Sequence, residues 1–110
     1  MTFKEWLNNQ CKARAMRTEG GIVDRVKFPI LKLNSGLQLS VQASEYHFCE
    51  PAETLNEEDS YESVEVYVGE QNVPELYAYV GNDECIRKYV PIEVMEKICE
   101  NNGGITDGNN

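Results

Sequence analysis

Residues 37–44, Leu-Gln-Leu-Ser-Val-Gln-Ala-Ser, alternate strictly between apolar and polar side chains. Successive side chains of a strand point to opposite faces of a sheet, so this period of two predicts a strand with one buried face and one wet face. The preceding Asn34-Ser35-Gly36 supplies turn residues, including a glycine that can adopt a positive φ. Because residues 22–33 before this turn are rich in β-branched and aromatic side chains, we expect a β-hairpin here.

Further strands are expected along the chain. Residues 61–68 alternate about their valines, and residues 85–90 follow the turn formers at Gly81-Asn82-Asp83. Pro29 has no N–H for a ladder, which predicts that its strand is an edge or is bulged there. Residues 75–80 are too few for their periodicity to distinguish a strand from a helical turn.

Helices are expected at both ends of the domain. Thr2 and Glu5 match the capping box, and the apolar stripe that follows predicts a helix to about Met16, with members at Phe3, Trp6, Leu7 and Cys11. A second helix is predicted from Pro91 to a glycine cap, on a stripe formed by Ile92, Met95, Ile98 and Cys99. The sequence therefore predicts one small two-layer α+β domain over residues 1–105. It has a mostly antiparallel sheet of about three to five strands, and residues 106–110 form a disordered tail.

The composition fits one globular domain and excludes several classes of function. The chain has 110 residues, of which 41% are hydrophobic and 26% are charged, and this length suits a single core. It contains no apolar run near the roughly 18–20 residues of a membrane span and no secretory leader, so we expect a soluble cytoplasmic protein that binds no membrane. A formal charge of −9 argues against direct binding to nucleic acid, whose phosphates attract basic surfaces.

Charge is distributed unevenly along the chain. Residues 1–33 hold seven bases and three acids (+4), whereas residues 34–110 hold three bases and sixteen acids (−13). Residues 50–60 contain five of these acids, several turn formers and no period, which predicts a surface loop. Such an acidic region attracts basic partners through its field, and its plainer interpretation is that it keeps the protein soluble.

One group of residues resembles a catalytic set, Glu45-Tyr46-His47-Phe48-Cys49. In an extended strand, Glu45, His47 and Cys49 share one face, with about 7 Å between alternate residues. A Cys–His–Glu relay then needs favourable rotamers, and a metal needs a further ligand from elsewhere. The plainer alternative is a structural histidine whose pKa is raised by neighbouring carboxylates. We therefore predict a non-enzymatic protein without a cofactor, and Glu45, His47 and Cys49 stay open as a metal- or thiol-dependent alternative.

Four cysteines, Cys11, Cys49, Cys85 and Cys99, include no C-x-x-C pair, so neither a zinc ribbon nor a thioredoxin-type redox site is indicated. Thiols stay reduced in the cytoplasm, and Cys11 and Cys99 fall on the apolar stripes of the two helices. We expect structural thiols without disulfides.

Several phrases of the chain resemble a known group of proteins. They are residues 40–44 with 46–49, Lys27-Phe28-Pro29, residues 61–66, and residues 89–94 running on to Gly103-Gly104-Ile105. These phrases look like short uncharacterised proteins encoded in prophages and mobile elements of Gram-positive (Firmicutes) bacteria. The resemblance covers roughly residues 24–105. It implies a setting, the cytoplasm of a bacterial host cell, and carries no activity or catalytic residue.

The leading hypothesis is a small acidic phage-type accessory protein that binds a basic protein partner. Its sharper form is a nucleic-acid mimic that inhibits a host system, because carboxylates at suitable spacing can occupy a basic channel. The candidate partner-binding residues are Glu50, Glu53, Glu57, Glu58, Asp59, Glu62, Glu65 and Tyr67. A second alternative is a self-assembling structural protein that pairs through the polar strand face of Gln38, Ser40, Gln42 and Ser44, which leaves the oligomeric state open.

Overall fold

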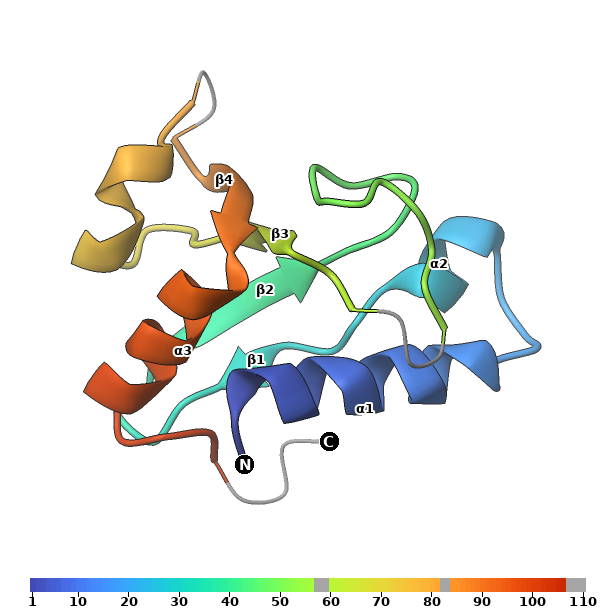
Figure 1. The fold of residues 1–110 in the computed structure, drawn as a ribbon, viewed down its shortest axis with the longest axis horizontal. Coiled ribbons are helices and arrows are strands. Elements are labelled where there is room, and N and C mark those ends of the chain that lie inside the picture. Colours follow the sequence, from blue (N-terminus) through green and yellow to red (C-terminus); the bar gives the residue numbers. More distant parts are fainter. Residues whose placement is uncertain (57–59, 82–83, 107–110) are drawn as a thin grey trace.

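A four-stranded antiparallel sheet with a helix at each end forms the protein (Figure 1). The computed structural model describes residues 1–56, 60–81 and 84–106. The elements in chain order are α1 (Phe3–Ala15), α2 (Ile22–Val26), β1 (Leu31–Lys32), β2 (Gln38–Gln42), β3 (Ser63–Tyr67), the 3-10 helix η1 (Pro74–Tyr79), β4 (Ile86–Pro91) and α3 (Ile92–Asn101). The predicted α+β class is confirmed, and α3 packs against α1.

The strands follow one another across the sheet in the order β1-β2-β3-β4, with every neighbouring pair antiparallel. The alternation of residues 37–44 is seen directly in β2, where Leu39 and Val41 are buried while Gln38 is exposed. The pairing of β3 with β4 shifts register between Val64 and Val66, which leaves Lys88 and Tyr89 of β4 opposite Glu65. This β-bulge shapes the surface described below.

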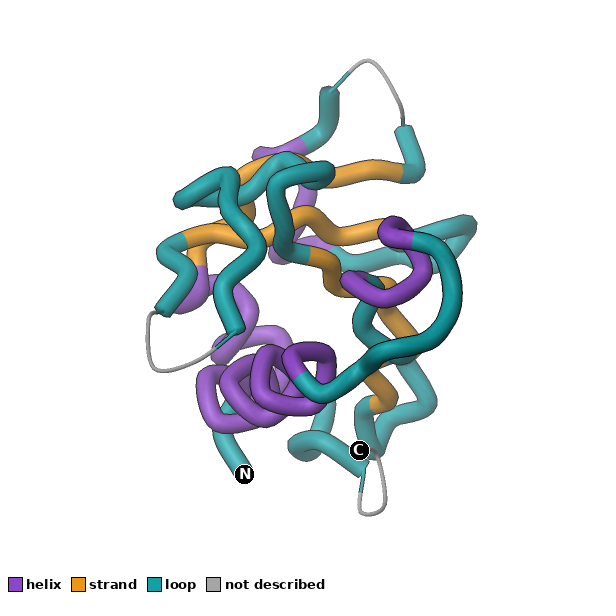
Figure 2. Tube along the Cα trace, turned by 90° about the vertical axis from the view of Figure 1, so that its right-hand side faces the viewer, coloured by secondary structure: helices purple, strands orange, loops and turns teal. Residues whose placement is uncertain are grey.

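One face of the sheet carries the core. Its strands contribute buried aliphatic side chains, and the helices cover them with buried residues that include Phe3, Trp6, Leu7, Met95 and Ile98. Each such side chain contributes about 1.5–3 kcal/mol when it leaves water. Figure 2 shows α1 running along one side of the sheet. We call the opposite side, which carries Gln38, Ser40, Gln42, Glu65 and Tyr67, the outer face. None of the described residues belongs to a helix long and apolar enough to cross a membrane.

The helices expected at the two ends of the domain, α1 and α3, are confirmed together with the residues that cap them. Thr2 and Glu5 form the capping box, and the Glu96 carboxylate of α3 also accepts hydrogen bonds from the backbone N–H groups of Phe3, at 2.6 Å, and Lys4. At the other end, Gly103 and Gly104 have φ values of 78° and 89°, and the Gly104 N–H donates to the Cys99 carbonyl. A side chain strains this backbone conformation, so glycine is required there.

Three other expectations, for residues 22–33, residues 75–80 and the C-terminal tail, differ from the structure or are only partly covered by it. The first arm of the predicted hairpin is wrong over most of its length, because residues 22–26 are helical and only Leu31–Lys32 pair as an edge strand after Pro29. The ambiguous residues 75–80 form most of η1. Thr106, expected in a disordered tail, donates its N–H to the Lys32 carbonyl, while residues 107–110 lie outside the described residues.

A buried arginine ties α1 to the rest of the chain. Arg14 lies on the apolar stripe of α1 and is only 4% exposed. Its five N–H groups are satisfied by neutral acceptors, namely the carbonyls of Val26, Ala43 and Leu55, Asn56 Oδ1 and the Tyr61 hydroxyl. The guanidinium also lies 4.6 Å from the centre of the Phe28 ring, a cation–π contact. This contact set holds Leu55, Asn56 and Tyr61 against α1. We call residues 50–56 and 60–62, to which they belong, the acidic connection.

Arg14→Met tests this arrangement. Removing the guanidinium leaves several buried acceptors without a donor, and each costs about 1–3 kcal/mol. We expect the free energy of unfolding, measured by urea denaturation, to fall by about 3 kcal/mol. Lys12→Met, at an exposed position of the same helix, should change it by less than about 0.5 kcal/mol. Similar small losses in both variants would contradict a structural role for Arg14.

Candidate functional site

Five of the eight predicted partner-binding residues belong to the described part of the chain, where they form two groups. Glu50, Glu53 and Glu62 are exposed on the acidic connection, and Glu65 and Tyr67 lie on the outer face of β3. Glu57, Glu58 and Asp59 lie outside the described residues. The acidic connection leads directly into β3, and Glu50 pairs with Ser63 at the start of that strand.

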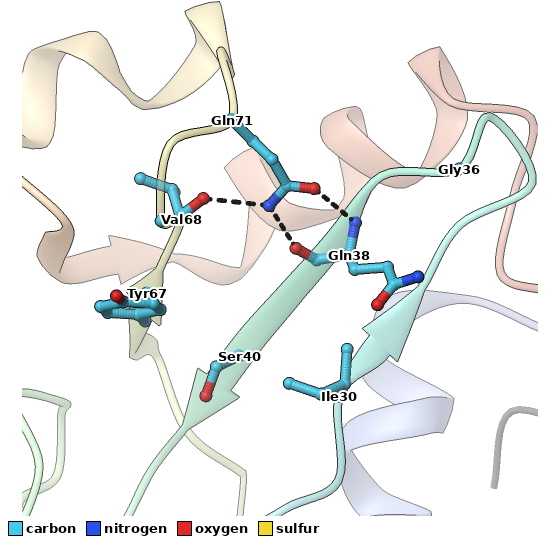
Figure 3. Close-up of a pocket in the computed structure, with 8 residues that line it drawn as sticks. Ile30, Gly36, Gln38, Ser40, Tyr67, Val68 and Gln71 are labelled. Carbon is cyan, nitrogen blue, oxygen red and sulfur yellow. Dashed lines mark hydrogen bonds between the residues drawn. The ribbon is translucent and has the colours of Figure 1, made fainter.

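A pocket of about 350 Å³ with a mixed polar and apolar lining opens on the outer face beside Tyr67. Figure 3 shows its lining side chains in front of the sheet, with helices behind it. The Gln71 side chain binds the backbone of Gln38 on both sides of its amide: Gln71 Oε1 accepts from the Gln38 N–H at 3.0 Å, and Gln71 Nε2 donates to the Gln38 carbonyl. The Gln71 side chain thus bonds to the Gln38 backbone as a neighbouring strand would, at a point beyond the end of β3. Ser40 and Tyr67 line the same pocket.

The β-bulge adds a second group of aromatic side chains to this side. Tyr89 has a φ of 54°, a left-handed conformation that is rare for a bulky residue, and its N–H donates to the Phe48 carbonyl. The Phe48 and Tyr89 rings meet edge to face at 6.0 Å, and Lys88 Nζ lies 4.1 Å from the centre of the Phe48 ring. Phe48 and Tyr89 are nevertheless 42% and 48% exposed.

Glu65 is the charged residue at the centre of this side. It is half-buried, and burial raises the pKa of its carboxyl above the ordinary value, an effect that the Lys88 ammonium partly offsets. We define the aromatic–acidic surface as Phe48, Glu65, Tyr67, Lys88 and Tyr89. Sequence reasoning found Glu65 and Tyr67. It missed Phe48, Lys88 and Tyr89, for which the sequence held no signal, because the bulge that groups them is a property of strand pairing.

The predicted face of Glu45, His47 and Cys49 does not form. Residues 44–48 are bends and turns rather than a strand, because the Ser44 hydroxyl accepts from the Tyr46 N–H and the Ser44 carbonyl accepts from the His47 N–H. This is the local bonding by which serine competes with a strand ladder. The self-assembly face is also incomplete, because Ser44 is buried and the Gln42 amide is bonded to the Phe28 backbone.

The three side chains take separate partners. The exposed Glu45 bonds to Thr54, the His47 ring Nδ1 lies 2.6 Å from Ser44 Oγ, and the Cys49 thiol donates to the carbonyls of Ser44 and Pro51. Among the side-chain hydrogen bonds of the described residues, none joins Glu45, His47 and Cys49 to one another. Nor do the described residues contain a cluster of three or more His, Cys, Asp or Glu side chains that could hold a metal ion.

The expected rise in the pKa of His47 is wrong. Burial lowers this pKa, and the positive charges of Arg14 and Lys27 lower it further. Burial also raises the pKa of the Cys49 thiol, which disfavours the thiolate that a nucleophile needs. The expected absence of disulfides is confirmed for Cys11, Cys49, Cys85 and Cys99. Burial, with the charges of Glu96 and Glu100, raises the pKa of Cys99 to about 12.

Comparisons with protein-family models, curated proteins and solved structures gave no match to this chain. The function is therefore argued from the geometry of the site.

The single histidine provides a direct test of this electrostatic environment. We expect its NMR titration midpoint to lie below the ordinary value of 6.5. The unfolded chain then binds the proton more tightly than the folded one, so the contribution of His47 to the free energy of unfolding falls as pH decreases below about 6.5. His47→Gln should remove that part of the pH dependence, measured by urea denaturation. A midpoint above 6.5 would contradict the burial of the His47 ring and the influence of the Arg14 and Lys27 charges on its pKa.

Proposed function

We propose that this chain is a non-enzymatic accessory protein that binds a basic protein partner through the aromatic–acidic surface and the adjoining acidic connection. The observation that carries the proposal is the outer face itself, where three aromatic side chains stay about half exposed around a carboxylate while the core occupies the other face. Aromatic side chains are enriched at protein interfaces, where they supply area and a polar tip.

Charge supports a basic partner. The chain carries −9 overall, and Glu50, Glu53 and Glu62 stand exposed beside β3. Opposite charges across an interface accelerate association and disfavour wrong partners. Lys88 lies over the Phe48 ring and close enough to Glu65 to affect its pKa. The surface therefore carries one positive charge among its carboxylates, and a partner must complement both signs.

Backbone conformation supports the same surface. A left-handed residue other than glycine costs roughly 1–2 kcal/mol, and bulges are common where a side chain is redirected for function. Tyr89 is held in this conformation at an exposed position instead of continuing a regular strand. A glycine would relieve this strain, so the presence of an exposed tyrosine at this position supports a role for its side chain.

The setting comes from the sequence resemblance to prophage-encoded proteins, which favours the cytoplasm of a bacterial host. In that setting, the sharper form of the proposal is that the surface imitates nucleic acid and inhibits a basic host protein. The catalytic and metal alternative at Glu45, His47 and Cys49 receives no support from the geometry, because their side chains are directed to different partners.

The test is affinity capture from a lysate of a Gram-positive bacterium, with three matched forms of the protein. Glu53→Lys with Glu62→Lys reverses two exposed charges of the acidic connection, and Glu93→Lys with Glu100→Lys makes the same change at exposed positions of α3. We expect a basic protein that is retained by the wild type at low salt, released at high salt, lost with the first variant and kept with the second. Tyr67→Ala should also weaken its retention.

Two further outcomes decide between forms of the proposal. Competition by added duplex DNA would support nucleic-acid mimicry, whereas retention unaffected by DNA would reject it and leave a simple protein interface. If wild type and both charge variants retain the same proteins, the acidic region only maintains solubility and the proposed function is wrong.

A further inference from the structure

A second pocket lies where the end of α1, α2 and the acidic connection meet, and the inference drawn from it does not rest on the aromatic–acidic surface. It has a volume of about 200 Å³ and is lined by Arg14, Arg17 and Arg25, together with Thr54 and Asn56. Three guanidinium groups therefore meet at one small cavity in a protein whose net charge is −9. Within residues 1–56, 60–81 and 84–106, none of these arginines forms an ion pair with a carboxylate.

Two of the three arginines are oriented by the backbone of α2 and the residue after it. Arg14 Nη1 donates to the Val26 carbonyl, and Arg17 Nη1 donates to the carbonyls of Arg25 and Lys27. The carbonyls of three successive residues, 25–27, thus accept from two arginines: Arg14 in α1 and Arg17 just after it. These bonds fix the arginines in place, and they add no negative charge.

Arg25 is the group that these contacts leave unexplained. Its Nε atom is buried and has no hydrogen-bond partner. A buried donor without an acceptor costs about 1–3 kcal/mol, and a charged one costs more. Buried polar groups without a partner in a folded protein call for an explanation such as a bound ion.

We infer that this pocket binds a phosphate group through Arg17 and Arg25. An oxyanion in the pocket would accept from the terminal N–H groups of Arg17 and Arg25 and reduce the repulsion among three like charges. Asn56 also lines the pocket, where its Oδ1 accepts from Arg14 Nε. Guanidinium groups suit phosphate because their N–H groups form parallel bonds to two oxygens.

Size limits the ligand. Pockets for drug-sized molecules hold roughly 300–1,000 Å³, and this one is smaller. It therefore fits inorganic phosphate or the phosphate of a small monoester, with the rest of the ester directed to solvent. Thr54 contributes to the wall only, because its hydroxyl is already bonded to Glu45.

The experiment is calorimetric titration of the whole chain with inorganic phosphate at low ionic strength, in a phosphate-free buffer. We expect one saturable site with a Kd on the order of 1 mM. Arg25→Gln should weaken it about tenfold or more. The Arg25 side chain donates none of the hydrogen bonds that hold α2, so this variant should fold. Lys97→Gln removes the same charge from an exposed position of α3 and should leave the Kd within about twofold.

Phosphoserine and AMP, titrated in parallel, identify the source of the phosphate, since the preferred ester binds more tightly than the free ion. No saturable binding, or equal weakening by Arg25→Gln and Lys97→Gln, would overturn the assignment. A variant with Glu57→Gln, Glu58→Gln and Asp59→Asn provides the last comparison. If phosphate binds this variant but not the wild type, carboxylates of the chain itself satisfy the arginines and the proposed ligand site is wrong.

Discussion

The burial of one arginine organises this small domain. Arg14 brings a full positive charge into the interior, which is tolerated because every N–H finds a neutral acceptor and an aromatic ring lies against the guanidinium. Its acceptors come from the end of α2, the residue after β2 and the acidic connection, so one side chain fixes all three segments to α1. The field of the same charge reaches His47, Cys49 and Tyr61 and contributes to lowering the pKa of the histidine.

This arrangement separates the molecule into two chemically different regions. The end of α1 and the short α2 hold Arg14, Arg17 and Arg25 around one pocket, whereas the acidic connection and β3 present carboxylates beside exposed aromatic rings. The sequence carries +4 in residues 1–33 and −13 in the remainder, and three of the basic residues of the first part lie around one pocket. The two regions meet at the acidic connection, whose Thr54 and Asn56 line the arginine pocket.

Local signals predicted the parts of the fold that local chemistry determines. The capping box at Thr2, the alternation of β2 and the glycine cap after α3 all depend on neighbours in sequence, and each was predicted correctly. The hairpin arm expected within residues 22–33 forms a strand only at Leu31–Lys32, because residues 22–26 are helical and the Arg14 and Arg17 side chains bind the carbonyls of residues 25–27. Arg14 itself carried a signal that was not used, since it follows Cys11 by three residues on the apolar stripe of α1. Phe48, Lys88 and Tyr89 gave no such signal, because a bulge between distant strands groups them.

The central claim is that the aromatic–acidic surface is the face that meets a partner. It is tested most directly by placing a photo-crosslinking phenylalanine derivative at Tyr67, and at Lys97 on α3 as a reference, in protein produced inside a Gram-positive host. Both positions are exposed, and they lie on different faces of the domain. The account predicts one dominant crosslinked product, to a basic protein, from position 67 and none of that product from position 97. The same product from both positions, or from position 97 alone, would contradict it.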